Sequence, residues 1–390
     1  MSLSRTKASL QGKMLDAQSL QSVTIDYLRF PMALAVVFIH SKGEPTIALP
    51  DYAHFAGTDF FNLLRIVMSN VLTSVAVPTF FLISGFLYFL NVPVLTQSVY
   101  KRKTRSRWHT LILPYILWNI IALVYLTLVA MARGYMSTHS LDFSILWQHM
   151  QGMHWLWDIF TWGDDHTNWL GYAVPATRPI NPPLWFLRDL IVVQLLSPVV
   201  WWWIKHTHAW GVALLALCYV SGVFPLIHGL GVQAVFWFSM GTWLSISGKN
   251  LVNAVRRVEW PAYAFTLILL PFMVRYNGMN TATGFMLEPF FELSGTISAF
   301  CIASRMVQRG ARPNSLLVKS CFFIYAIHTM LVNGVTYNLL NHLLRTDAWW
   351  AQSLKYVVAP FLTIAICLGL YLLAQRFFPR ITGWLTGDRR

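Results

Sequence analysis

Ten apolar runs recur along the chain, each close to the roughly 20 residues that a helix needs to cross about 30 Å of hydrocarbon. Several runs are short for a straight crossing, and the boundary between residues 203 and 209 is the least distinct. The pattern predicts an all-α polytopic membrane protein with about ten transmembrane helices. The runs lie at residues 25–41, 66–90, 108–132, 184–203, 209–227, 232–247, 260–275, 286–304, 318–340 and 354–377.

Lysine and arginine residues favour one side of the predicted helices. With the N-terminus in the cytoplasm, the inner segments hold 19 of the 29 basic residues and the outer segments hold five. Cytoplasmic loops are enriched in these residues, and an odd number of helices would scramble the asymmetry. The first residues also lack the apolar core of a signal peptide. We therefore expect two cytoplasmic tails, 1–24 and 378–390, around one membrane domain at 25–377.

The composition agrees with a membrane protein, since 56% of the residues are hydrophobic and only 11% are charged. A soluble domain carries about 25% charged residues. The formal charge of +14 does not indicate nucleic-acid binding, because the basic residues lie between apolar runs rather than on one polar face. Four cysteines in apolar stretches show no disulfide or zinc spacing, which indicates packing roles. They are Cys218, Cys301, Cys321 and Cys367.

The predicted outer loop at residues 133–183 is rich in tryptophan, aspartate and histidine. Tryptophan faces stack on sugars and aspartates accept sugar hydroxyls, so the loop is a candidate acceptor platform; an interfacial helix with a tryptophan belt is the alternative. Its four histidines have no recognised ligand spacing, and we predict no metal site. The residues are Trp147, Trp155, Trp157, Trp162, Trp169, Asp142, Asp158, Asp164, Asp165, His139, His149, His154 and His166.

The first predicted helix carries ionisable residues at two levels. Arg29 and His40 are eleven positions apart, about 16 Å along a helix, and project to nearly the same side. Asp26 lies three residues before Arg29 and can share that face. Such a stripe is unfavourable against lipid and should line a cavity, with Arg29 nearer the cytoplasm and His40 nearer the outer surface. The alternative is an interfacial Asp–Arg pair at one end of the helix and a histidine at the other.

Four segments, in order along the chain, resemble the acyltransferase-3 family. They are Arg29 with ten residues before His40, and the runs Phe80–Phe86, Pro183–Leu187 and Phe323–His328. That family consists of ten-helix membrane acyltransferases that modify extracytoplasmic glycans, commonly by O-acetylation of sugars in lipopolysaccharide or exopolysaccharide. The resemblance covers residues 24–377. It implies a bacterial inner-membrane enzyme with acyl-CoA as donor, a glycan as acceptor and no bound cofactor.

The resemblance also assigns roles on the first helix. His40 matches the first-helix histidine of the family, so we expect a general base for the acceptor hydroxyl or a transient acyl carrier. Arg29 matches the partner arginine, which would hold the donor or stabilise negative charge on the thioester oxygen. Asp26 is expected to orient Arg29. These three residues form the predicted catalytic set.

A basic run at residues 101–107 is the candidate donor site on the cytoplasmic side, with Arg102, Arg105 and Arg107 as its arginines. Guanidinium groups bind phosphates such as those of acyl-CoA well. The enrichment of basic residues beside cytoplasmic helix ends explains such a cluster equally. Donor binding and membrane orientation are therefore both open as explanations of the basic run.

Other predicted helices contribute further donor candidates. Tyr325 and His328 are three apart and can face the cavity of Arg29 together, although a histidine bonded to a neighbouring helix is the competing interpretation. Ser84 is a candidate hydrogen-bond donor, without the GxSxG elbow of a nucleophile. Close helix packing is the expected role of the adjacent Gly85.

Three residues are assigned to the acceptor. Glu288 and Glu292 lie four apart on the outer half of the eighth predicted helix, where a carboxylate facing lipid is unfavourable. Either could orient His40 or receive the proton of the acceptor hydroxyl; a bond to a helix end or an interfacial arginine is the alternative. Trp185, in the third family segment, is the remaining acceptor candidate. The Arg188–Asp189 pair that follows reads as a local charge pair.

Two other functions fit part of the pattern. A secondary transporter also has about ten helices and buried ionisable groups, but the sequence shows neither duplicated halves nor helices broken at matching places. A polysaccharide-export subunit without acyl-transfer activity would leave His40 dispensable. The basic cytoplasmic run and the histidine on the first helix favour a membrane-bound O-acyltransferase, most simply an O-acetyltransferase.

Overall fold

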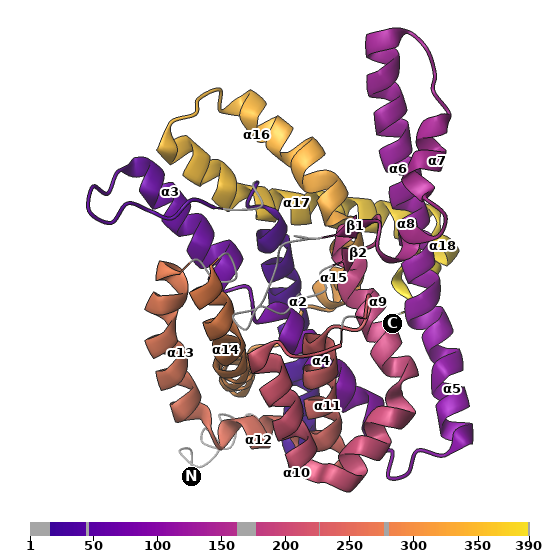
Figure 1. Cartoon of the computed structure of the whole chain (residues 1–390), viewed down its shortest axis with the longest axis vertical. Helices are drawn as coiled ribbons and strands as arrows, with labels where there is room; N and C mark the ends of the chain where they lie inside the picture. The colour runs from indigo at the N-terminus through magenta and orange to yellow at the C-terminus, as the bar shows by residue number, and fades with distance from the viewer. Residues whose placement is uncertain (1–15, 44–46, 162–176, 226, 277–280, 389–390) are drawn as a thin grey trace, which may run out of the picture.

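Helices make up almost the whole fold. The computed structural model describes residues 16–43, 47–161, 177–225, 227–276 and 281–388. Two short strands pair antiparallel, β1 (Phe160–Thr161) with β2 (Thr177–Arg178). The helices, drawn in Figure 1, are α2 (Ala17–His40), α3 (Gly57–Arg65), η1 (Ile66–Val71), α4 (Ala76–Phe89), α5 (Gln97–Arg107), η2 (Trp108–Ile112), α6 (Leu113–Thr138), α7 (Ser144–Met150), α8 (His154–Trp157), η3 (Pro182–Leu184), α9 (Trp185–Leu195), α10 (Ser197–Ser221), α11 (Val232–Ile246), α12 (Leu251–Arg256), α13 (Glu259–Arg275), α14 (Ala282–Gln308), α15 (Ser315–Leu331), η5 (Val332–Thr336), α16 (Tyr337–Leu343), α17 (Trp349–Phe377) and α18 (Pro379–Thr386).

Helices cover most of each predicted apolar run, and the all-α membrane-type fold is confirmed. Among the described residues, five helices are long and apolar enough to cross a membrane, or up to seven if each of two bent pairs is one crossing. The helices α11 and α13, with 15 and 17 residues, are short for a crossing. The number of ten crossings and the cytoplasmic location of both termini stay predictions.

The least distinct predicted boundary coincides with a kink. Helix α10 continues through it, but His208 has non-helical backbone angles, φ 52° and ψ −130°. A second bend, of 65°, separates α9 from α10. Pro198 lies in the first turn of α10, where its missing N–H is tolerated and its fixed φ favours a helix start. The kink at His208 thus falls at the boundary that the pattern indicated, whereas the bend between α9 and α10 lies near the middle of a run expected to be one helix.

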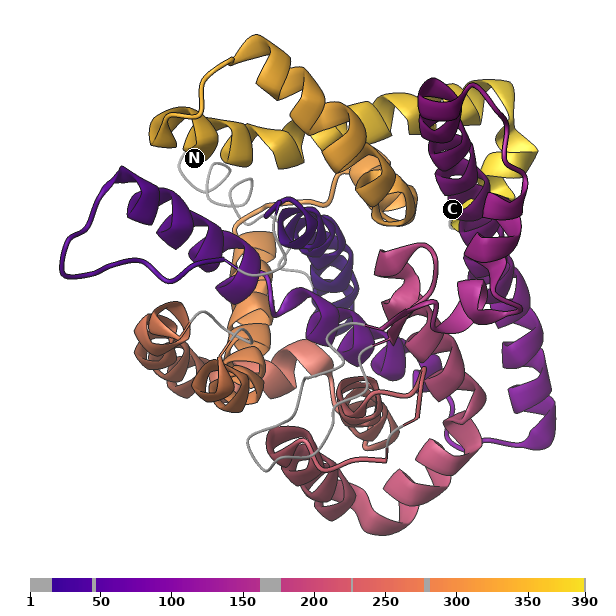
Figure 2. The ribbon, with the colours of Figure 1, turned by 45° about the horizontal axis from the view of Figure 1, so that its top comes forward.

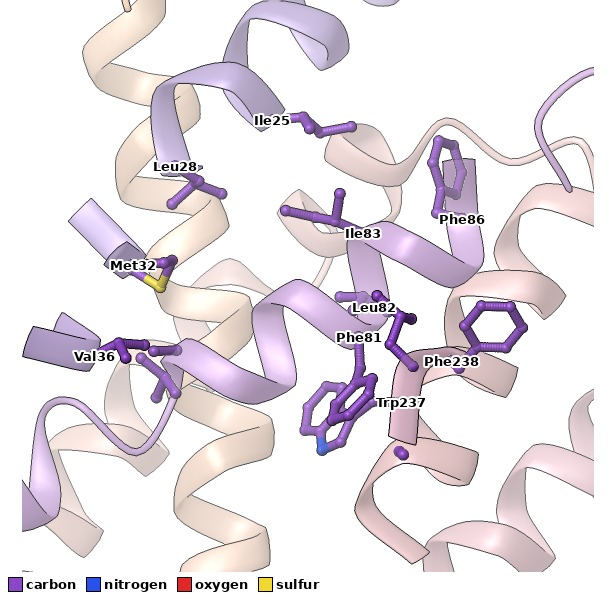
Figure 3. Packing of buried hydrophobic residues seen from close by; sticks show 14 of the residues in the cluster. Ile25, Leu28, Met32, Val36, Phe81, Leu82, Ile83, Phe86, Trp237 and Phe238 are labelled. Carbon is purple, nitrogen blue, oxygen red and sulfur yellow. The ribbon is translucent and has the colours of Figure 1, made fainter. Parts of the chain in front are cut away.

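Helix α2 lies in the middle of the fold, in contact with α4, α14, α15 and α17 (Figure 2). Its side chains Ile25, Leu28, Met32 and Val36 are buried at helical spacing. These residues and Ile83 of α4 belong to one packed cluster, part of which is drawn in Figure 3. Because protein surrounds much of α2, this helix can carry ionisable side chains that would be unfavourable in lipid.

Helices α4 and α11 approach each other through two glycines. A Cβ atom on Gly85 would lie 2.1 Å from the carbonyl oxygen of Phe238, and a Cβ atom on Gly241 would lie 2.2 Å from that of Leu82. Small residues permit such close backbone contact between membrane helices. The predicted packing role of Gly85 is therefore confirmed.

The longest helical segment runs through α5, η2 and α6. Its 41 residues, Gln97–Ser137, correspond to about 60 Å, roughly twice the thickness of the hydrocarbon layer. Figure 1 shows α6 and α7 extending beyond the rest of the fold. The first residues of the predicted outer loop, up to Thr138, therefore belong to α6.

Candidate active site

A cavity of about 420 Å³ lies between α2, α4, the end of α5, η2, α9 and α15. Its polar lining includes the basic side chains of Arg29, Arg107 and Lys319, together with Ser84 and Tyr325. Phenylalanine and leucine side chains of α4 and α9 form much of its apolar part, and Val318 and Phe322 of α15 add to it. Four predicted site residues thus share one cavity. Lys319 also lines the cavity. From the sequence it was counted only among the basic residues of the inner segments and was not predicted as a site residue.

The basic run is divided between two faces of α5. Lys103 donates a hydrogen bond to the carbonyl oxygen of Tyr88, and the Arg107 guanidinium lies 5.6 Å from the centre of the Tyr88 ring. Arg102 and Arg105 are exposed and are not part of the cavity lining described above. Residues four apart share a helical face, so helical spacing alone could have separated Arg107 from the other two arginines.

Arg29 lies at the cavity end of the ionisable stripe on α2. Its Nη1 atom is 3.2 Å from Oδ1 of Asp26, and both side chains are more than one-third exposed. Ala33, one turn further along α2, also lines the cavity. His40 is the last residue of the helix, about 16 Å beyond Arg29. The cavity therefore lies beside the middle of α2 and His40 at its C-terminal end, separated along the helix as the spacing predicted; the catalytic roles stay predictions.

His328 lies beside His40 rather than beside Arg29. The centres of the two imidazole rings are 5.1 Å apart, and the rings are tilted by 53°. Tyr325, one turn earlier on α15, lines the cavity, and its hydroxyl donates to the carbonyl oxygen of Pro183. Helix α15 thus has one candidate at the cavity and one at His40. The expectation that both residues line the cavity of Arg29 was correct only for Tyr325.

Side chains from other elements hold the backbone at the His40 end of α2. Ser69 of η1 donates to the carbonyl oxygen of Phe38 (2.6 Å), and Tyr337 of α16 donates to that of Ser41 (2.5 Å). Arg65 of α3 donates to the carbonyl oxygen of Lys42 (3.0 Å). Phe38 lies in the last turn of α2, and Ser41 and Lys42 follow its end, so the three bonds hold the backbone on both sides of His40.

Basic side chains gather just beyond His40. Burial lowers the pKa of Lys42, and the positive charges of Arg178 and Arg65 lower it further. Arg178 lies on β2, close to Asn181, whose amide donates to the carbonyl oxygen of Ala326 on α15 (2.9 Å). The strand pair is therefore attached to the helix that carries His328, and Arg178 brings positive charge to the His40 end of α2.

The two predicted acceptor carboxylates are buried on α14. Glu288 and Glu292 are 7% and 2% exposed. Glu292 accepts hydrogen bonds from the Tyr219 hydroxyl and from the Gln233 amide (3.0 Å). These bonds connect α14 to α10 and α11 rather than to His40. Trp185 is half-buried at the start of α9, and the acceptor roles of all three stay predictions.

The described part of the outer loop packs onto the helices. Trp157 donates to the carbonyl oxygen of His228, and the buried Arg188 donates to the carbonyl oxygens of Trp157 and Thr177. Arg188 also pairs with the adjacent Asp189 at 2.9 Å, the expected local pair. Trp155 is buried and Trp147 is 74% exposed, so these two tryptophans do not share one exposed surface. Trp162, Asp164, Asp165, His166 and Trp169 lie outside the described residues.

A carboxylate attaches this loop to the segment before α11. Asp158 accepts hydrogen bonds from His154 (2.5 Å) and His228 (2.7 Å). Burial alone would raise the pKa of Asp158, but the bonds and charges of the two histidines outweigh it, and the pKa is lowered. No three histidine, cysteine or acidic side chains of the described residues form a group that could hold a metal ion.

Comparison with known proteins covers nearly the whole chain. A family model described as an acyltransferase domain matches residues 23–372. The chain is also similar to the succinoglycan biosynthesis protein ExoH of Rhizobium meliloti (strain 1021), with 26% identity over 381 residues, 94% of this chain and 92% of the relative. No solved structure matches.

Proposed function

The chain belongs to the acyltransferase-3 family, and we propose that it moves an acyl group from cytoplasmic acyl-CoA to a sugar hydroxyl on a glycan across the membrane. The observation that carries this proposal is the arrangement along α2. A basic cavity contains Arg29, and a histidine pair lies at the end of the same helix. Ten crossings, cytoplasmic termini and a place in the bacterial inner membrane complete the proposal.

The cavity has the chemistry of an acyl-CoA site. Three positive side chains, Arg29, Arg107 and Lys319, face one space, and acyl-CoA carries a pyrophosphate and a ribose phosphate. Arginine binds such groups through two parallel hydrogen bonds, and lysine binds them as a point charge. The apolar side chains of α4 and α9 provide a surface for the acyl-bearing arm.

His40 provides the base for acyl transfer. As it accepts the proton of the sugar hydroxyl, the oxygen attacks the thioester carbonyl, the carbon–oxygen bond forms and the carbon–sulfur bond breaks. Coenzyme A then leaves as the thiol after taking up a proton. An acyl group carried transiently on His40 gives the same products. Arg29 would hold the donor, and the ion pair with Asp26 restrains its guanidinium.

A polysaccharide is the acceptor that the comparisons favour. ExoH is named for succinoglycan biosynthesis, and the likeness to it extends over nearly the full length of both chains. We therefore propose an exopolysaccharide or lipopolysaccharide sugar as acceptor. The acyl group is most simply acetyl, transferred to oxygen.

The test is transfer across a membrane. Purified protein is reconstituted in liposomes that enclose an exopolysaccharide oligosaccharide, and acyl-CoA with a radiolabelled acyl group is added outside. We expect alkali-labile label on the enclosed oligosaccharide while coenzyme A stays outside. Acetyl-CoA and succinyl-CoA are compared as donors. Label that enters without forming an ester would contradict the proposal and support a transporter.

Arg107 and Arg105 form a matched pair for testing the donor site. Replacing Arg107 by glutamine should weaken binding of acyl-CoA to the purified protein roughly 10- to 100-fold, because a charged hydrogen bond contributes about 1.5–3 kcal/mol. The same change at the exposed Arg105 should alter the dissociation constant less than about twofold. Calorimetric titration with acetyl-CoA measures both. An unchanged dissociation constant in the Arg107 variant would return the basic run to a purely topological role.

A further inference from the structure

The buried ring of His328 has a fixed hydrogen-bonding pattern. Its Nδ1 atom lies 2.8 Å from the carbonyl oxygen of Tyr325 and 3.2 Å from that of Ile324. A carbonyl oxygen only accepts, so Nδ1 must carry the hydrogen, and Nε2 of the neutral ring then has a free lone pair. The side chain is fully buried, and Nε2 has no hydrogen-bond partner among the described residues.

A buried acceptor without a donor is unfavourable by about 1–3 kcal/mol, and such an atom in a native fold calls for an explanation. The ring of His40, 5.1 Å away between centres, is the aromatic group in contact with His328. A neutral imidazole has one bare nitrogen and one N–H. If the bare nitrogen of His40 serves the acceptor, its N–H remains available to His328.

We propose that His328 is the proton-relay partner of His40. The inference rests on the proposed acyl transfer and adds a second histidine to it. The hydroxyl proton enters the bare nitrogen of His40, and the hydrogen on the opposite nitrogen passes to Nε2 of His328. The resulting positive charge lies beside the carbonyl oxygens of Tyr325 and Ile324. Return of the two hydrogens by the same route supplies the proton that the leaving thiolate takes up, so the cycle restores both neutral rings.

The other ionisable groups around the pair do not replace His328 in this role. Lys42 and Arg178 are the charged groups that act on His40, and both are cations that cannot accept a proton when charged. Glu292 is bonded to Tyr219 and Gln233 instead. The imidazole of His328 is therefore the acceptor that the described geometry offers to His40. Because it acts through His40, His328 is a positioning and relay residue.

Kinetics of His328→Gln provide the first test. Glutamine keeps a polar amide at the site but cannot take up a proton, so kcat for transfer should fall about 100-fold or more, while KM for acyl-CoA stays within about twofold of the wild type. The matched control is His342→Gln at an exposed position on α16, which should keep normal kcat. The pH profile of kcat should also lose one inflection in His328→Gln. A kcat near the wild-type value would overturn the proposal.

Chemical rescue separates a relay from a packing role. In His328→Ala, added imidazole should restore activity, whereas pyrazole, a ring of the same size and a far weaker base, should not. Equal restoration by both compounds, or no restoration by imidazole in protein shown to be folded by size exclusion, would overturn the proposal. Failure of the proposed function is distinguishable from failure of the relay. If the proposed function is wrong, the wild-type protein itself transfers no acyl group; if only the relay is wrong, the wild-type protein remains active.

Discussion

Alanine in place of His40 should abolish acylation of the cell-surface glycan. We expect the ester content to fall about 1,000-fold, because the variant loses the group that takes the acceptor proton, and general-base catalysis contributes roughly 10²- to 10⁴-fold. Removal of a group that also carries the acyl moiety would reduce it further. Mass spectrometry of the purified glycan measures the ester content, with the amount of protein checked in the membrane fraction.

The control for this experiment is another histidine of the same chain. His342 is exposed on α16, so His342→Ala should leave acylation unchanged. Persistent acylation in the His40→Ala strain would contradict a catalytic role for His40. It would favour a polysaccharide-export subunit in which this histidine is dispensable.

Adding one methyl group at Gly85 should destabilise the fold strongly. The new Cβ would lie 2.1 Å from the carbonyl oxygen of Phe238, far inside contact distance, so α4 and α11 must separate. Overpacking of this kind is unfavourable by about 1–3 kcal/mol, and the reciprocal contact at Gly241 would be lost with it. Thermal unfolding of Gly85→Ala in detergent, followed by tryptophan fluorescence, should show a lower melting temperature.

Gly369 provides the matched control within a helix. A Cβ atom there would meet nothing within 4 Å, and alanine is favoured over glycine in a helix by up to about 1 kcal/mol. Gly369→Ala should therefore keep or raise the melting temperature. A similar fall in both variants would show that glycine at position 85 is not needed for contact between α4 and α11.

The helices could be predicted from sequence because apolar length is a local property. Most of each apolar run became helical, and the positions of Arg29 and His40 followed from helix geometry alone. The number of crossings could not be fixed in the same way. Bends such as the 65° one between α9 and α10 depend on packing with other helices, and hydropathy does not record them.

The site was predictable where one helix determines it. Arg29 and Ser84 line the cavity as expected. Arg102 and Arg105 are exposed because they do not share the helical face of Lys103 and Arg107. The spacing of these residues in the sequence could have shown this. The contact between His328 and His40 could not, because it depends on how α15 packs against α2. The partners of Glu292 were likewise beyond reach, since two other helices supply them.

The hydrogen bonds at the end of α2 also determine where sequence change is tolerated. Ser69, Tyr337 and Arg65 all bond to main-chain oxygens, and every amino acid presents the same oxygen. Substitutions at residues 38, 41 and 42 therefore leave these three hydrogen bonds, and the support that they give to His40, intact. The constraint falls instead on side chains of η1, α16 and α3, so compensating substitutions for a shifted His40 should arise in segments remote from it in sequence.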